Sequence, residues 1–154
     1  MTVDVSEPAP GGVDPRAVAS FAEATLRREG VDAEAHLTVS FVDVDTMADL
    51  NQRFMGKSGP TDVLSFPIED ATPGIPPTRQ PEGPPLDLGD IVISVDVVAE
   101  HADEYGVSFD DELFLMVCHG VLHILGWDHQ TELEAEAMEA REAEHLGTIG
   151  RSRR

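Results

Sequence analysis

The segment from Leu113 to Leu125 is apolar on nearly every face of a helix, and it constrains the fold more than any other part of the chain. A helix of this kind is stable in water only where other elements cover it on all sides. Ser108 precedes it, with Asp111 three residues later, a pattern typical of a helix N-terminus. We therefore expect one central helix, with the rest of the chain built around it.

A length of 154 residues and an apolar fraction of 41% are sufficient for one domain with a single core. The sequence has no apolar run of about 18 residues, so we expect no membrane-spanning helix and no membrane partner. The N-terminal segment has neither the basic nor the apolar region of a signal peptide. Because Cys118 is the only cysteine, no internal disulfide can form, and a cytoplasmic protein is expected.

Apolar periodicity predicts the elements that surround the central helix. Helices are expected over 15–29, 45–55, 96–105, 108–125 and 131–146, and strands over 36–42, 63–66 and 91–95. Three or four strands mixed with about five helices, without strict alternation, predict an α+β fold. In this single domain, a small mixed sheet of about four strands would pack with the helices.

Proline and glycine divide the chain into segments. Seven of the eleven prolines lie in residues 67–88, which we interpret as a long surface loop, with disorder as the alternative. Residues 1–14 are expected to be flexible, since the first dozen are rich in proline and glycine. The folded domain is predicted over 15–146, followed by a basic C-terminal tail over 147–154.

Three of the six histidines lie within eleven residues, at His119, His123 and His129. The first two are four residues apart, so their imidazoles lie on one face of the central helix, about one turn apart. Gly126 can end the helix in a left-handed turn and bring His129 back to the same ion. Three histidines leave one position of a tetrahedral ion open, which is typical of catalytic zinc. The spacing therefore predicts one metal ion, with zinc favoured for imidazole ligands and nickel, copper or iron as the alternatives.

A core position without metal is the alternative for each of these histidines, but burying an unpartnered imidazole costs about 1–3 kcal/mol. The spacing is that of the metzincin proteases, H-E-x-x-H-x-x-G-x-x-H. Gly120 stands where those proteases have the glutamate that acts as general base. Because such a base commonly contributes about 10²–10⁴-fold in rate, standard proteolysis is not expected.

The histidine segment and two others resemble a known family. HGVLHILGWDH at 119–129 resembles the H-G-x-L-H-x-x-G-x-D-H signature of the YbeY family, the bacterial ribosomal-RNA maturation endoribonucleases. PTDVLSFP at 60–67 and LGDIVI at 88–93 resemble two further segments of that family. The resemblance covers roughly residues 35–146. It implies one α+β domain with a metal-binding cleft, and metal-dependent cleavage of single-stranded RNA.

The resemblance also implies a biological role and partners. The role is processing of the 3′ end of the small-subunit ribosomal RNA, together with ribosome quality control. The partners would be ribosomal RNA, a small-subunit ribosomal protein and the Era GTPase. By the same resemblance, His119, His123 and His129 are the zinc ligands, and His119 counts among the catalytic residues.

Asp128 matches the aspartate of the signature. It could orient a ligand histidine, act as a base or cap the turn after Gly126. Thr61, Asp62 and Ser65 match the strand that lines the cleft in the family, and turn or edge-strand chemistry is their alternative role.

Position 55 departs from the family pattern. Many members have an arginine there that is regarded as important for RNA cleavage, whereas this chain has Met55. The nearest cations are Arg53 and Lys57, and we predict that they substitute for it as catalytic cations. Lys57 lies in the loop before a strand and could reach a phosphate, whereas Arg53 lies on a different helical face.

Three functions compete for this sequence. The favoured one is a zinc-dependent endoribonuclease that acts in ribosomal RNA maturation, with attack by either metal-activated water or the ribose 2′-hydroxyl. The second is a zincin-like hydrolase of another substrate, which Gly120 disfavours. The third is a ribosome-assembly factor whose zinc is mainly structural, an alternative that Met55 keeps open.

The formal net charge of −20 bears on how RNA would be found. Binding to any RNA depends on Lys and Arg, which are few here, so we expect weak general affinity and targeting by a partner. The glutamates of the last helix are interpreted as a solvated face. His36, His101 and His145 have no partner at ligand spacing and are interpreted as surface or structural residues.

Overall fold

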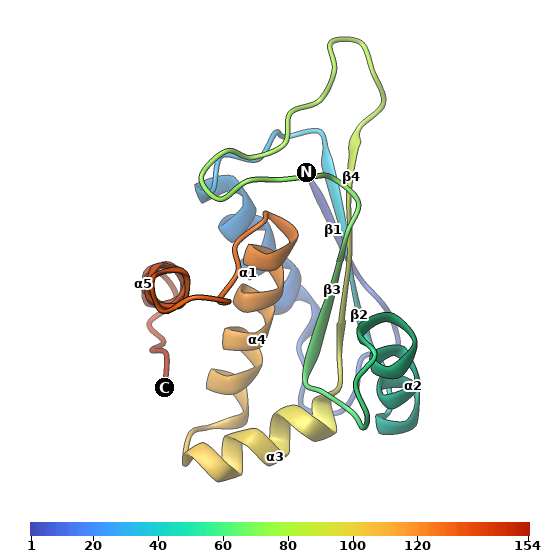
Figure 1. The fold of residues 1–154 in the computed structure, drawn as a ribbon, viewed down its shortest axis with the longest axis vertical. Coiled ribbons are helices and arrows are strands. Elements are labelled where there is room, and N and C mark those ends of the chain that lie inside the picture. The colour runs from blue at the N-terminus through green and yellow to red at the C-terminus, as the bar shows by residue number, and fades with distance from the viewer.

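Four strands and four other helices surround the apolar helix in the computed structural model, which describes residues 1–154 (Figure 1). In chain order they are β1 (Thr2–Val5), α1 (Pro15–Arg28), β2 (Ala35–Phe41), α2 (Val44–Met55), β3 (Val63–Pro67), β4 (Leu86–Ile93), α3 (Val95–Tyr105), α4 (Phe109–Ile124) and α5 (Glu132–Gly147). None of the helices has both the length and the apolar character that crossing a bilayer requires.

The sheet has the strand order β1-β2-β4-β3. β1, β2 and β4 run parallel, whereas β3 pairs antiparallel with β4, with Leu64 opposite Val92. The sheet is therefore mixed, and β3 forms one of its two edges. The predicted α+β fold with a small mixed sheet is confirmed.

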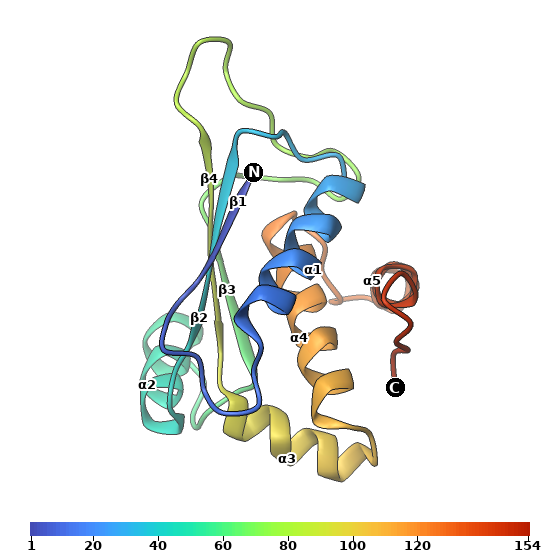
Figure 2. The same ribbon diagram turned by 180° about the vertical axis from the view of Figure 1, so that it is seen from behind.

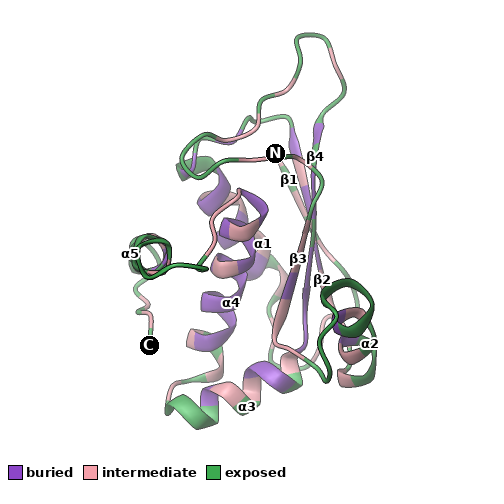
Figure 3. Ribbon diagram, in the orientation of Figure 1, coloured by how far each residue is buried: buried purple, intermediate pink, exposed green.

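The helices form layers on both faces of the sheet (Figures 1 and 2). α1 and α4 cover one face, and α5 lies beyond α4, while α2 packs on the opposite face and α3 runs across one end. α4 is buried along most of its length (Figure 3), and its residues belong to the main core. The prediction of one central helix is confirmed, and the histidines that it carries lie at the core rather than on a peripheral element.

Local side-chain hydrogen bonds fix where the helices begin. The hydroxyl of Ser108 accepts a hydrogen bond from the backbone N–H of Asp111 at 3.0 Å, as its sequence pattern predicts. The start of α2 differs from the prediction, because Asp43 rather than Asp45 is the cap and accepts from the backbone N–H of Thr46 at 2.7 Å. Both aspartates lie near the helix N-terminus, so residue type alone does not predict which of them caps the helix.

The N-terminal segment is more ordered than its composition predicts. Thr2–Val5 forms β1, which extends the sheet beside β2, with Val3 opposite Leu37. Val3 and Val5 pack against the main core, and the burial of these side chains favours the strand over a frayed end. The expectation of a flexible segment over residues 1–14 is therefore wrong for these four residues.

The proline-rich segment is a long loop, seen at the top of Figure 1, with one isolated bridge between Thr72 and Ile75. The loop is shorter than predicted because β4 begins at Leu86. Leu86 and Leu88 are buried in the main core, which accounts for the earlier start of the strand.

The C-terminal arginines lie against the domain rather than in a free basic tail. Arg151 pairs with Asp111 at 2.7 Å, Arg153 with Glu142 at 2.9 Å and Arg154 with Glu112 at 2.8 Å. Glu112 and Glu142 are almost fully buried, so these arginines neutralise charges inside the fold. The segment thus supplies little free positive charge for RNA.

Candidate metal centre

The three predicted histidines converge in the structure. His119 and His123 lie one turn apart on α4, with 2.9 Å between their Nε2 atoms. The ring centre of His129 lies 5.3 Å from that of His119 and 5.1 Å from that of His123. One nitrogen from each ring falls within 4.8 Å of the others, so one ion can contact all three. The predicted ligand set is therefore geometrically sound.

The turn that returns His129 to the helix depends on Gly126. This residue has φ +92°, a left-handed conformation that glycine adopts without strain, and its N–H donates to the carbonyl of His123 at 3.0 Å. A side chain at this position would collide with the backbone of Ala71. The proline-rich loop therefore packs directly against the turn that positions His129.

The other ring nitrogens of the two helical histidines are held by hydrogen bonds. His119 Nδ1 donates to Glu142 Oε2 at 2.9 Å, and His123 Nδ1 donates to the carbonyl oxygen of Trp127 at 2.8 Å. With Nδ1 occupied, each ring presents Nε2 to its neighbours, which is the arrangement found around protein-bound zinc. The donor set and its orientation therefore fit one zinc ion.

Sequence reasoning missed Glu142, because the glutamates of α5 were interpreted as a solvated face. The side chain of Glu142 is only 2% exposed. Burial alone would raise its pKa, but hydrogen bonds from His119 and Arg153 hold the pKa below its ordinary value. A signal was present in the sequence: Glu142 lies four residues from both Met138 and Leu146, in the apolar stripe of the helix.

His123 is prepared to bind a cation. Burial lowers its pKa to about 4, and the neighbouring His119 adds to the effect. The ring is therefore neutral at pH 7. A neutral imidazole is the form that coordinates metal, so no proton has to be removed from His123 at physiological pH.

Gly120 is required by packing between the central helix and the sheet. A Cβ at this position would lie 2.9 Å from Ile91 Cγ2, closer than packed carbon atoms approach. The glutamate of the metzincin pattern therefore has no room here, because this face of α4 is against β4. The carbonyl oxygen of Gly120 instead accepts a hydrogen bond from Ser65 Oγ at 2.9 Å, which ties β3 to α4 beside His119.

The three histidines open into a cleft of about 320 Å³ between α4, β3 and the end of α2. Its other walls include Lys57 and the residues from Thr61 to Ser65, as the resemblance implied. A neighbouring hollow of about 490 Å³ shares Lys57 and His129 and adds Asp128 and Gln130. Together they form an open surface beside the histidines that is large enough for an extended polymer segment.

Of two further predicted catalytic residues, Arg53 lies away from both hollows, and Asp128 lines one of them beside His129. Arg53 pairs with Asp49 at 3.3 Å on the exposed side of α2 and lines neither hollow, so it does not take the place of the family arginine. Asp128 Oδ1 accepts a hydrogen bond from the backbone N–H of His129 at 2.8 Å, which is its turn-capping role. The carboxylate that orients a ligand histidine is Glu142, not Asp128.

The remaining candidates occupy the expected kinds of position. Lys57 lines the cleft, and its neighbour Met55 lies there too, with 43% of its surface exposed. Cys118 is fully buried, and burial raises its thiol pKa, so it is a packing residue.

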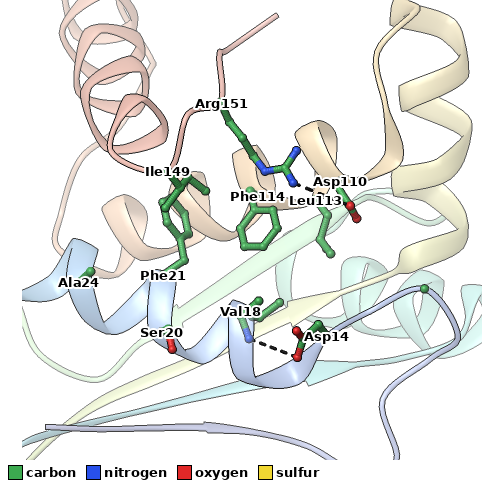
Figure 4. A pocket seen from close by; sticks show the side chains of 12 residues that line it. Asp14, Val18, Ser20, Phe21, Ala24, Asp110, Leu113, Phe114, Ile149 and Arg151 are labelled. Carbon is green, nitrogen blue, oxygen red and sulfur yellow. Dashed lines mark hydrogen bonds and ion pairs between the residues drawn. The ribbon is translucent and has the colours of Figure 1, made fainter.

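A separate, more apolar hollow lies between α1, α4 and the C-terminal segment (Figure 4). Phe21 and Phe114 form its floor, with rings in edge-to-face contact at 5.4 Å. Arg151 and Asp110 stand at its rim. None of the predicted site residues lines this hollow.

Comparisons with known proteins identify the family of the chain. A family model described as "Endoribonuclease YbeY" matches residues 14–150. Curated relatives named "Endoribonuclease YbeY" include one from Beutenbergia cavernae, 42% identical over 92% of this chain and 89% of the relative. Another, from Bacillus subtilis, is 40% identical over 88% of this chain and 86% of the relative. The solution structure of a Thermotoga maritima protein is similar with a TM-score of 0.61 and 26% identity, covering 96% and 91% of the two chains.

Proposed function

The chain belongs to the endoribonuclease YbeY family, and from that premise we propose that it cleaves RNA with one zinc ion held by His119, His123 and His129. The observation that supports zinc most directly is the convergence of three imidazoles, two of which have Nδ1 held by a carboxylate or a carbonyl. The resemblance stated from the three sequence segments is confirmed by the family match.

The proposed substrate is a single-stranded region of ribosomal RNA, in maturation of the small-subunit 3′ end and in ribosome quality control. Support comes from the lining of the cleft, where Lys57, Thr61 and other polar or charged residues outnumber the apolar ones around the histidines. We place this work in the cytoplasm. A small-subunit ribosomal protein and an Era-type GTPase would bring the enzyme to its RNA, because the acidic surface provides little attraction of its own.

The residues of the cleft would divide the work of strand cleavage. When bound, zinc supplies a Lewis acid that polarises a phosphoryl oxygen or lowers the pKa of water toward about 7. Lys57 would contact a phosphate on the cleft wall as a mobile cation. Asp128 remains the proposed base, since one of its carboxylate oxygens is not used by the turn.

One other function has a specific observation in its favour. Met55 lines the cleft where many family members have an arginine, and Arg53 is directed elsewhere. A ribosome-assembly factor with a mainly structural zinc would need no such arginine. Peptide hydrolysis is disfavoured, because packing against Ile91 leaves no room for a glutamate at position 120.

The test combines metal analysis with cleavage of a single-stranded RNA by wild type, His119→Ala and Met55→Arg. We expect one zinc per chain and RNA cleavage in the wild type, loss of both in His119→Ala and faster cleavage in Met55→Arg. His36→Ala is the matched control, because His36 pairs with Asp4 on the far edge of the sheet. Wild-type protein that holds zinc but cleaves no faster than His119→Ala would overturn the nuclease proposal in favour of the assembly factor.

A further inference from the structure

A second group of potential metal ligands lies outside the three histidines. Asp62, which precedes β3, His101 of α3 and Glu112 of α4 each place one ligand atom within 4.8 Å of the others. His101 Nδ1 and Asp62 Oδ2 are 3.0 Å apart. Two ligands on opposite sides of an ion with bonds of about 2.1 Å are roughly 4.2 Å apart, so small side-chain movements suffice to close the group around one ion.

Glu112 has an unusual environment for a carboxylate. Its side chain is fully buried, and Oε1 accepts a hydrogen bond from Arg154 Nε at 2.8 Å. Its other oxygen, Oε2, has no hydrogen-bond partner. Burying a carboxylate oxygen without a partner costs more free energy than burying a neutral polar atom in the same place. A cation bound to this oxygen would offset that cost.

Asp62 connects this group to the cleft that contains the three histidines. Glu112 precedes His119 by seven residues, or two helical turns, which separates them by about 10 Å along α4. Asp62 lines the cleft together with the three histidines. A cation bound there would therefore be distinct from the zinc, yet it would face the same bound polymer.

The positive side chain that pairs with Glu112 is held by two contacts. Arg154 donates to Glu112 through Nε, and its guanidinium lies 3.7 Å from the centre of the Tyr105 ring. One guanidinium charge does not balance the two carboxylates of Asp62 and Glu112. Arg154 therefore acts as a partial counter-ion that competes with a metal for Glu112.

We propose that Asp62, His101 and Glu112 bind a second divalent cation and that Arg154 competes with it. Two carboxylates and one imidazole suit Mn²⁺ and similar transition ions better than Ca²⁺, which prefers oxygen ligands alone. The binding does not depend on nuclease activity. If the proposed function also holds, the cation would neutralise a phosphate of the RNA strand at a distance from the zinc.

The experiment measures Mn²⁺ binding by electron paramagnetic resonance on full-length protein loaded with one equivalent of zinc, which occupies the three-histidine site. We expect one Mn²⁺ per chain, with affinity reduced at least 10-fold in His101→Ala and in Glu112→Gln. His36→Ala is the matched control, because the His36–Asp4 pair, at 2.8 Å, has no third ligand within reach. The control should bind Mn²⁺ like the wild type.

Arg154→Gln tests the competition, and it should tighten Mn²⁺ binding several-fold. Equal affinity in Arg154→Gln and wild type would overturn the competition, and equal affinity in His101→Ala and wild type would overturn the site. If Glu112→Gln fails to fold, His101→Ala still decides, because the side chain of His101 is 31% exposed and its loss is tolerable. Zinc content near one per chain in every variant separates this result from a failure of the three-histidine site.

Discussion

At the scale of single residues, the sequence predicts the three histidines of the candidate metal centre but not the carboxylate that contacts one of them. His119 and His123 follow from helical spacing, and His129 from the glycine turn, because all three depend on local geometry. Glu142 comes from another helix, and its partnership with His119 depends on how α5 packs on α4. A helical pattern predicts which side chains are buried but not which residue of another helix they contact. The contact between Glu142 and His119 could therefore be found only in the three-dimensional structure.

The first prediction concerns Glu142→Gln. The amide cannot supply the negative charge that raises the basicity of His119, so zinc affinity should fall about 10–100-fold. Competition with a coloured chelator measures this affinity. Glu136→Gln, on the exposed face of the same helix, should leave it unchanged. Equal zinc affinity in Glu142→Gln and wild type would show that the carboxylate is not needed to orient His119.

The second prediction concerns Gly120→Ala. The added methyl meets Ile91 at 2.9 Å, so the variant should unfold more easily, by about 1–3 kcal/mol, despite the better helix propensity of alanine. Urea denaturation measures the free energy of unfolding. Gly147→Ala is the control, because a Cβ there meets nothing within 4 Å and the change should be neutral or stabilising. A Gly120→Ala protein as stable as wild type would contradict the packing explanation.

At the scale of elements, the internal helices and strands could be predicted well, and the ends of the chain could not. Apolar periodicity located α1, α4 and β2 within a few residues, because their burial patterns are regular. β1 is four residues long and depends on pairing with β2, which a local pattern does not contain. The C-terminal segment, predicted as a basic tail, likewise owes its position to buried acids on α4 and α5, which a local pattern does not reveal.

The third prediction concerns this C-terminal segment. Arg153→Gln removes the cation that pairs with buried Glu142, and the free energy of unfolding should fall by about 1–3 kcal/mol. Arg27→Gln breaks an exposed pair with Glu23 and should cost less than about 1 kcal/mol. Thermal unfolding followed by calorimetry compares the two variants. A smaller loss in Arg153→Gln than in Arg27→Gln would contradict a structural role for the segment.

At the scale of the whole molecule, a net charge of −20 is compatible with membership of an RNA-cleaving family, because the positive side chains have different roles. Arg151, Arg153 and Arg154 are paired with acids of the fold, and Arg53 with Asp49. Lys57 is the cation that lines the cleft. The prediction of weak general RNA affinity can therefore be stated more narrowly: the proposed RNA would meet one lysine and the proposed metal as positive charges in the cleft.

The fourth prediction follows from this count of cations. In a His119→Ala background, where cleavage is stopped, Lys57→Ala should weaken binding to a single-stranded RNA and reduce the slope of log K against log salt by about 0.7. Fluorescence anisotropy between low and moderate salt measures the slope. Arg27→Ala, on the exposed face of α1, should change neither quantity. An unchanged slope in Lys57→Ala would place the RNA elsewhere on the surface.

The dependence of His119 on Glu142 and Arg153 has a consequence for the order of events in synthesis. A ribosome makes the chain from the N-terminus. The three histidines are therefore synthesised before Glu142, which orients His119, and before Arg153, which neutralises Glu142. The nascent domain thus carries its ligands for a time without their support from α5. Tight loading of the proposed metal would therefore require that α5 and Arg153 have first packed against α4.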